Sequence, residues 1–312
     1  MDASKYDGRR YIIGKDAIPP WLKDKKSRAF GFSGIGASGS ATPLPGRITI
    51  ANGATGILPI FIHDDAYFLV EQIQILSSLQ TVDQDKATVL ITDTTSSTQW
   101  SNVAVPLRDI AGLGANPKFL LDPNILRPSS TLQVQITNNS GSDATFYPLL
   151  MGRKIYGVTK GEADFLTRRQ WFQYVLALPA QTAGLANLAT NLQIYNESDF
   201  MVKRLYSQQL INAIINATAG SESAETLIQL RDTISDVNLF DNAVAARLLF
   251  GMTQGETIAG QANWALGQPF TLKKPWLLRR NGQIVATTTN LANSTIPACS
   301  LVLEGIRIFD PV

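Results

Sequence analysis

"NILRPSSTLQVQITN", residues 124–138, and "WLLRRNGQIVATTTN", residues 276–290, are two versions of one passage in a chain of 312 residues. In both, an apolar pair precedes an arginine and a short polar corner, and an alternating run then ends in Thr-Asn. Alternation of polar and apolar residues is typical of a half-buried β-strand. The sequence therefore predicts the same strand–turn–strand unit at two places.

The similarity extends beyond this passage and can be followed as an offset in residue number. "ANGATGILPIFIHDDAYFLV" from residue 51 aligns with "AGLANLATNLQIYNESDFMV" from residue 183, an offset of 132. The offset is 140 where Asn102 aligns with Asn242, 152 in the quoted passages, and 153 where Gly152 aligns with Gly305. Because it only increases, the second copy is the first with insertions between strands, where added length is tolerated.

From residue 48 onward, short runs rich in Val, Ile, Thr and aromatic residues alternate with turn residues. This pattern predicts an all-β fold of two tandem duplicated β-sandwiches, jelly-roll-like, with minor helical insertions. The expected division is an extended N-terminal arm at 1–47, a first sandwich at 48–156, a linker at 157–171 and a second sandwich at 172–312. The linker is expected to be helical for a turn or two, and 210–236 to form a helix or a projecting loop.

The residues repeated between the copies have structural explanations, and we interpret them as scaffold. A proline ahead of a strand loses no needed amide, and an asparagine that ends a strand can enter a left-handed turn. A glycine inside the last strand indicates a bulge or a close backbone approach. Lys154 and Arg307, which follow these glycines, are expected to point outward. The repeated scaffold comprises Pro123, Arg127, Asn138 and Gly152, with their counterparts Pro275, Arg279, Asn290 and Gly305.

The arm combines basic residues with spaced apolar ones, and its prolines and Gly/Ser run prevent a long helix. We expect it to lie across a neighbouring subunit; the alternative is an arm packed on its own domain. Its basic cluster could contact nucleic-acid phosphates, but an embedded aspartate favours a protein surface. The expected subunit-contact residues are Arg9, Arg10, Ile12, Ile13, Trp21, Leu22, Lys25, Lys26, Phe30 and Phe32.

The composition limits the classes of function. Hydrophobic residues make up 45% of the chain and charged residues only 17%, below the usual quarter, which indicates burial against other subunits. The net charge of +2 gives no general argument for nucleic acid or membrane. No run approaches ~18 apolar residues and the start has no apolar signal core, so we expect a soluble protein made in a cytoplasm. The single cysteine, Cys299, is expected to be a buried thiol, and one histidine rules out a multi-histidine metal site.

Two short motifs point weakly to chemistry. Residues 34–39 satisfy GxGxxG, but "SATPLP" follows and forbids the helix that a dinucleotide site needs. His63, Asp64 and Asp65 read as a polar strand end rather than a weak cation contact, because adjacent strand residues point to opposite faces. A glycosidase pair of carboxylates remains the enzymatic alternative. We expect a non-enzymatic protein without metal or cofactor.

The arm, the tandem sandwiches, the low charge and the motif "PNILRPSSTLQVQITNNSGSDATFYPLLMGRKIY" with its copy resemble bacteriophage virion structural proteins, in particular jelly-roll proteins of viral shells. The resemblance covers roughly residues 48–312. It implies assembly in or on the capsid, as a decoration or cement protein or as a minor or double jelly-roll capsid protein. The implied partners are the chain itself, as a homo-oligomer such as a trimer, and other virion proteins. The implied location is the virion, after synthesis in the host cytoplasm, without membrane contact.

Two alternatives stay open beside this reading. One is a head–tail or tail accessory protein. The other is a host-glycan-binding tandem β-sandwich module, which needs exposed aromatic residues on a sandwich face or loop. Its candidates are Trp100, Trp264 and Trp276, although Trp276 lies in the repeated strand and is expected in the core.

Overall fold

The computed structural model describes residues 25–34, 46–79, 81–112, 118–182, 187–207, 209–210, 226–250, 269–291 and 295–309. Strands of the first half are β1 (Ser27–Ser33), β2 (Ile48–Ile50), β3 (Thr55–Phe61), β4 (Tyr67–Ser77), β5 (Ala87–Asp93), β6 (Thr98–Gln99), β7 (Val105–Pro106), β8 (Lys118–Leu126), β9 (Thr131–Asn138) and β10 (Ala144–Ile155). Those of the second half are β11 (Arg169–Leu178), β12 (Asn187–Gln193), β13 (Asp199–Tyr206), β14 (Thr226–Asp232), β15 (Val237–Asn238), β16 (Val244–Ala245), β17 (Phe270–Leu278), β18 (Gln283–Asn290) and β19 (Cys299–Ile308). The short helices are η2 (Thr81–Lys86), α3 (Leu107–Ile110), α4 (Lys160–Thr167) and α6 (Ala246–Phe250).

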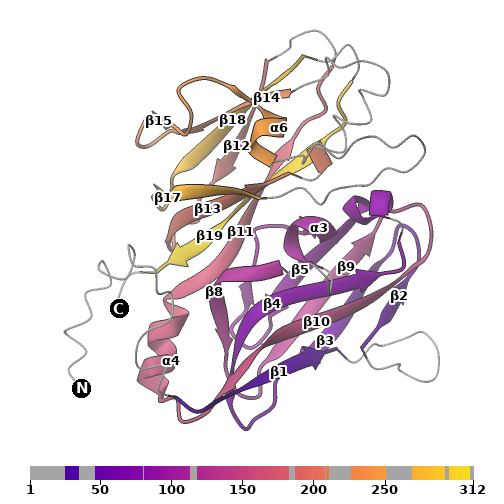
Figure 1. Ribbon diagram of the computed structural model, residues 1–312, viewed down its shortest axis with the longest axis vertical. Helices are drawn as coiled ribbons and strands as arrows, with labels where there is room; N and C mark the ends of the chain where they lie inside the picture. Colours follow the sequence, from indigo (N-terminus) through magenta and orange to yellow (C-terminus); the bar gives the residue numbers. More distant parts are fainter. Residues whose placement is uncertain are drawn as a thin grey trace.

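Each half is a sandwich of two antiparallel sheets (Figure 1). The first half has sheets in the order β1-β10-β4-β8, with β2 beside β10, and β3-β9-β5-β6, with β7 beside β5. The second half repeats this order, as β11-β19-β13-β17 and as β12-β18-β14-β15 with β16 beside β14, except that no described strand corresponds to β2. The predicted all-β fold of two duplicated sandwiches is confirmed.

The quoted passages form equivalent corners of the two sandwiches. Each runs from the end of an edge strand, β8 or β17, through a turn into a central strand, β9 or β18. Along β9 every second side chain is buried, and β18 has the same alternation. The turns match as well, since Ser129 and Asn281 both have a positive φ, at 61° and 58°. The alternating pattern thus builds one inner face per copy.

The middle of the alignment needs a correction of one residue. β14 begins at Thr226 where β5 begins at Ala87, an offset of 139. Asn102 is therefore equivalent to Asp241, and the predicted match with Asn242 is wrong. The turns β5–β6 and β14–β15 support this offset, because each has a residue with positive φ at the equivalent position, Ser97 in one copy and Asp236 in the other.

The first sandwich begins earlier than residue 48, because β1 lies within the stretch expected to be an arm. β1 pairs with β10 along its whole length, and Phe32 is buried in the core of its own sandwich. Its counterpart is β11, which starts inside the expected linker: Phe30 pairs with Gly152 just as Phe172 pairs with Gly305. This part of the arm follows the second alternative and packs on its own domain. The expected contact residues Arg9, Arg10, Ile12, Ile13, Trp21 and Leu22 lie outside the described residues.

The other irregular stretches differ partly from expectation. The linker contains the helix α4, as expected, and a capping box at Thr159 and Glu162 fixes its start. Lys25 forms an ion pair with Glu162 at 3.0 Å, so the end of the arm is tied to this helix. The stretch 210–236 was expected to be a helix or loop, yet it contains strand β14. Residues 211–225 of that stretch, and 35–39 of the GxGxxG motif, lie outside the described residues.

The repeated glycines occupy the bulges expected from their place in the last strand. The register of β10 on β4 shifts between Met151 and Gly152, and the register of β13 on β19 shifts beside Gly305. A Cβ atom at Gly152 would collide with the carbonyl oxygen of Leu69, and one at Gly305 with that of Met201. Close backbone approach therefore requires glycine at both positions.

We expect Gly305→Ala to lower the free energy of unfolding by about 3 kcal/mol, because the added methyl group meets backbone that cannot rotate away. Urea unfolding followed by tryptophan fluorescence measures the change. Gly161→Ala is the matched control: its Cβ meets nothing within 4 Å and it lies in α4, so stability should rise slightly. Wild-type stability of Gly305→Ala would contradict this account of the bulge.

Candidate functional site

The two sandwiches are packed against each other through one face of the second. Trp171, Val175, Tyr206 and Val302 point out of the sheet β11-β19-β13-β17, away from its own core. They are at most 8% exposed, because they pack with the core residues of the first sandwich. β8 and β11 lie side by side at this junction (Figure 1). The two halves thus share a continuous hydrophobic cluster.

Two asparagines of the first sandwich bind the free edge of β11. The amide N–H of Trp171 donates to Asn124 Oδ1 at 2.8 Å, and Asn124 Nδ2 donates to the Trp171 carbonyl at 3.3 Å. Asn102 makes the same pair of bonds with Val175, at 2.7 and 3.1 Å. Between them, the amide of Gln173 donates to the carbonyl of Trp100 at 3.0 Å. The edge strand has its buried backbone groups satisfied, which fixes how the sandwiches dock.

A buried ion pair crosses the same interface. Glu304 of β19 is fully buried, and Lys118 of β8 places Nζ 2.8 Å from its Oε2. Trp171 Nε1 donates to Glu304 Oε1 at 2.8 Å, and the ammonium lies 3.4 Å from the centre of the Tyr206 ring. Burial alone would raise the pKa of Glu304, but the charge and hydrogen bond of Lys118 and the bond from Trp171 together hold this pKa below its usual value. The carboxylate is therefore ionised and paired.

Each sandwich also buries a cation beside its bulge glycine. Lys154 and Arg307 were expected to point outward; this is wrong, since each is 4% exposed. They lie two residues after Gly152 and Gly305, on the same side of the strand, and their side chains therefore point into the sandwich. Lys154 pairs with Asp65 at 2.7 Å, and Arg307 pairs at 2.7 Å with Glu197, the residue equivalent to Asp65. Aromatic rings cover both cations, which compensates for their burial.

His63 and Asp65 meet at this buried lysine. His63 Nδ1 lies 3.0 Å from Lys154 Nζ, and the hydrogen bond from Lys154 lowers the pKa of Asp65. They follow the end of β3, as expected for a polar strand end, and the cation that they contact is an ammonium group. Within the described ranges no group of three His, Cys, Asp or Glu residues could hold a metal ion.

The other repeated residues serve the scaffold in ways that the sequence shows only in part. Asn138 and Asn290 were expected to enter left-handed turns, but neither has a positive φ. Their buried side chains instead donate to the carbonyls of Ile50 and Thr182, at 3.0 and 3.2 Å, and so fasten equivalent segments to the strand end. Pro123 and Pro275 were expected ahead of a strand; this is wrong, since they lie within the edge strands β8 and β17, where a missing amide is tolerated. The exposed Arg127 and Arg279 pair with Asp164 and Asp199.

Of the aromatic candidates for glycan contact, Trp100 is not available at the surface. Trp100 is 3% exposed and packs edge-on against Trp171 in the interface. Trp276 is half-buried against the second core, and Trp264 lies outside the described residues. Cys299 is buried as expected, and burial raises the pKa of its thiol to about 12. In the part of the chain that the structure describes, no helix is long and apolar enough to cross a membrane.

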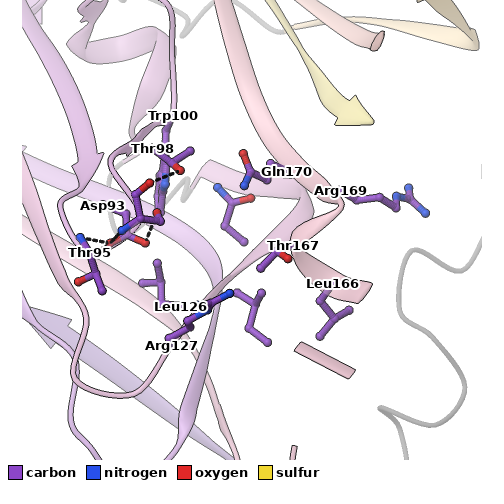
Figure 2. A pocket seen from close by; sticks show the side chains of 13 residues that line it. Asp93, Thr95, Thr98, Trp100, Leu126, Arg127, Leu166, Thr167, Arg169 and Gln170 are labelled. Atoms are coloured by element: carbon purple, nitrogen blue, oxygen red, sulfur yellow. Dashed lines mark hydrogen bonds between the residues drawn. The ribbon is translucent and has the colours of Figure 1, made fainter. Parts of the chain in front are cut away.

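Two hollows follow the junction of the sandwiches on one side. The smaller, about 160 Å³, lies between the β5–β6 turn, the end of β8 and the start of β11. Figure 2 shows Thr98, Trp100 and Gln170 at its upper side and Leu126 and Arg127 below them. The larger, about 700 Å³, adjoins it and shares residues of the β5–β6 turn and Gln170. Together they form the concave region described below.

Sequence reasoning missed the interface residues Asn102, Asn124, Lys118 and Glu304. A signal was present: in the quoted passages Asn124 aligns with Trp276, and Glu304 aligns with Met151. Where two copies of one sandwich differ in polarity at an equivalent strand position, their surroundings differ. Such positions are therefore candidates for contacts between the copies.

No family model matches the sequence, and no curated protein matches it either. Among solved structures, PBCV-1 VP54 has 8% identity, covers 92% of this chain and 95% of its own, and gives a TM-score of 0.43. The STIV MCP has 11% identity, 91% and 97% coverage and a TM-score of 0.42; both are viral major capsid proteins. A peptide-N(4)-(N-acetyl-β-D-glucosaminyl) asparagine amidase has 11% identity, 92% and 98% coverage and a TM-score of 0.34. At this level of similarity none of them assigns a function to the chain.

We expect Lys118→Met to lower the free energy of unfolding by about 3–5 kcal/mol, because it leaves the Glu304 carboxylate buried without its partner. The double variant Lys118→Met/Glu304→Gln should recover part of the loss. Denaturant unfolding at pH 7 measures both. Lys86→Met, which breaks an exposed pair with Asp83, should cost less than about 1 kcal/mol.

The pH dependence of stability provides the cross-check. Because the pKa of Glu304 in the folded chain lies below its usual 4.5, its stabilising effect is present above that value and is lost as the pH falls through the folded pKa. The curve of Glu304→Gln should therefore be flatter than that of the wild type below pH 4.5. Parallel curves, or a Lys118→Met variant as stable as the wild type, would contradict the buried pair.

Proposed function

We propose that this chain is a structural subunit of a viral shell, which binds further copies of itself by repeating the contact between its own two sandwiches. The observation that carries the proposal is an uncovered apolar surface. Within the described residues, the first sandwich leaves open part of the sheet face that is buried in the second sandwich around Val302 and Glu304. The tandem jelly-roll-like fold and the resemblance in sequence to viral shell proteins support the viral role.

The open surface, called the free face, lies on the outer side of the sheet β1-β10-β4-β8. Its members are Leu76, Phe119, Tyr147, Leu149 and Met151. Leu76 is 56% exposed, Phe119 53% and Tyr147 38%, so these apolar side chains contribute little to the packing of a single chain. In the second sandwich the positions equivalent to Leu149 and Met151 are fully buried by the first sandwich. Apolar residues grouped on an exposed sheet face indicate a protein contact.

The second sandwich carries a surface that fits the free face. Several polar residues of the first sandwich take part in the internal contact. Asn102 and Asp122 have polar equivalents in the second sandwich, Asp241 and Lys274, whereas four others do not: Ser101, Asp109, Lys118 and Asn124. Their equivalents in the second sandwich are all apolar, and we call them the docking edge: Phe240, Leu248, Phe270 and Trp276. Leu248 is 76% exposed, where Asp109 is 2% exposed. The apolar docking edge is complementary to the apolar free face, in the same way that Lys118 of the first sandwich is complementary to Glu304 of the second.

This pairing gives a head-to-tail contact, in which the docking edge of one copy covers the free face of the next. Such heterologous contacts form closed rings when the rotation closes. We propose the closed trimer, in which three chains would arrange six related sandwiches. Burial of apolar area at about 25 cal/mol per Å² provides the driving force. The low charge content of the chain suits this arrangement.

We favour a double jelly-roll capsid subunit over a decoration, cement or tail protein. Both apolar surfaces are accounted for by identical copies, which is what a shell lattice of one subunit needs. Other virion proteins would then contact the remaining surfaces. The protein would be located in the virion of a virus such as a bacteriophage. The enzymatic alternative has no comparable observation in its favour.

We expect Leu76→Lys to weaken self-association at least tenfold, because the contact would bury an unpaired charge. Native mass spectrometry and light scattering over a range of concentrations measure the oligomer. Ile234→Lys is the matched control, since Ile234 is 55% exposed but lies on the β14–β15 turn. Equal loss in both variants, or a wild type that stays monomeric, would contradict the proposal.

A further inference from the structure

The larger hollow at the junction is built from both sandwiches and is separate from the surfaces assigned to assembly. It has a volume of about 700 Å³, within the range of about 300–1,000 Å³ typical of small-molecule sites. One wall is the β5–β6 turn of the first sandwich. The other consists of β11, residues 195–197 and the end of β19 from the second. None of its lining residues belongs to the free face or to the docking edge.

The wall from the first sandwich is lined by short uncharged polar side chains. They are Thr92, Thr94, Ser96, Ser97, Thr98 and Gln99. Hydroxyl groups both donate and accept hydrogen bonds, and the amide of Gln99 does so as well. This wall can pair with a ligand that is itself covered with hydroxyl groups.

The opposite wall is aromatic and held rigid by a buried cation. Phe172, Tyr195 and Phe309 surround the Arg307 guanidinium, whose Cζ lies 4.9, 5.3 and 4.8 Å from their ring centres. Arg307 is fixed in turn by Ser198 Oγ at 2.9 Å and by Glu197 at 2.7 Å. Tyr195 is 37% exposed, so its ring is available at the surface. A wall ordered before binding reduces the entropy lost on binding.

The charge and polarity of the groove select the kind of ligand. Glu197 and Arg307 neutralise each other, and the lining residues include no further charged side chain. The Glu197 side chain is 67% exposed, so its carboxylate can accept hydrogen bonds from a bound molecule. The buried Oε1 atom of Gln170 finds no donor among the described residues, and it lies where the two hollows meet. A phosphate or nucleic acid would meet no net positive charge here.

We propose that this groove binds a neutral saccharide. The apolar C–H face of a sugar ring would pack on Tyr195 and Phe309, and its hydroxyl groups would pair with Glu197 and the threonine-rich wall. A ligand without hydroxyl groups would leave these polar atoms unpaired, which costs binding energy. The aromatic platform is thus supplied by Tyr195 rather than by a tryptophan. The equivalent of Tyr195 in the first sandwich is His63, so the platform is specific to the second copy.

Saturation-transfer NMR with maltohexaose, chitohexaose and mannopentaose tests the groove on the full chain. We expect transfer to the ring C–H protons of at least one of these sugars, and a loss of about tenfold or more in affinity in Tyr195→Ala. Tyr147→Ala is the matched control, because Tyr147, on the free face, is 38% exposed, close to the 37% of Tyr195. It should bind the sugar like the wild type.

The outcomes separate this inference from the assembly proposal. Leu76→Lys should bind sugar normally even as a monomer, because the groove lies within one chain. No transfer from any of the three sugars, or equal binding by Tyr195→Ala with its fold intact by circular dichroism, would overturn the inference. So would clear preference for a sialylated oligosaccharide over its neutral parent, because the groove carries no net positive charge.

Discussion

The docking of β11 against the first sandwich is the contact on which the rest of the structure depends. A strand at the edge of a sheet exposes unpaired backbone groups, and here the side chains of Asn102 and Asn124 satisfy them. Because each asparagine bonds both the N–H and the C=O of one residue, the strand cannot slide without breaking several bonds. Glu304 and Lys118 add a buried pair with strict geometry. The orientation of the two sandwiches, and the groove between them, follow from this contact.

Because the two sandwiches are copies of one domain, the same kind of interface can form within one chain and, as we propose, between two chains. Both copies keep the bulge glycine, the buried cation and the strand-end asparagine, which their common backbone needs. They differ at positions around the internal contact, where Asn124 of the first copy corresponds to Trp276 of the second. The internal contact is polar and specific, suited to parts that are never separated. The proposed contact between chains is apolar at equivalent positions, such as Met151 for Glu304, and association can therefore be driven by burial.

Much of the fold could be predicted from sequence, because alternation and turn residues are local signals. The quoted passages gave the offset of 152 correctly, and the last strand of each copy gave the bulge glycines. β1 was missed because the sequence around it is rich in Pro, Gly, Ser and Lys, and its seven-residue run "SRAFGFS" was counted with that sequence. The inward direction of Lys154 and Arg307 was missed because the compensating carboxylates and rings come from distant parts of the chain. The junction groove needs both sandwiches in place, so no local pattern could predict it.

Site-specific cross-linking between copies tests the central claim most directly. Within one chain, positions 118 and 304 are in contact, so the repeated contact should place Phe270 of one copy beside Met151 of the next. Chains carrying Met151→Cys and chains carrying Phe270→Cys should be joined by a short bismaleimide when mixed, while buried Cys299 stays unreactive. Each variant alone should give no such product. Cross-links between two Met151→Cys chains, or none in the mixture, would contradict head-to-tail assembly.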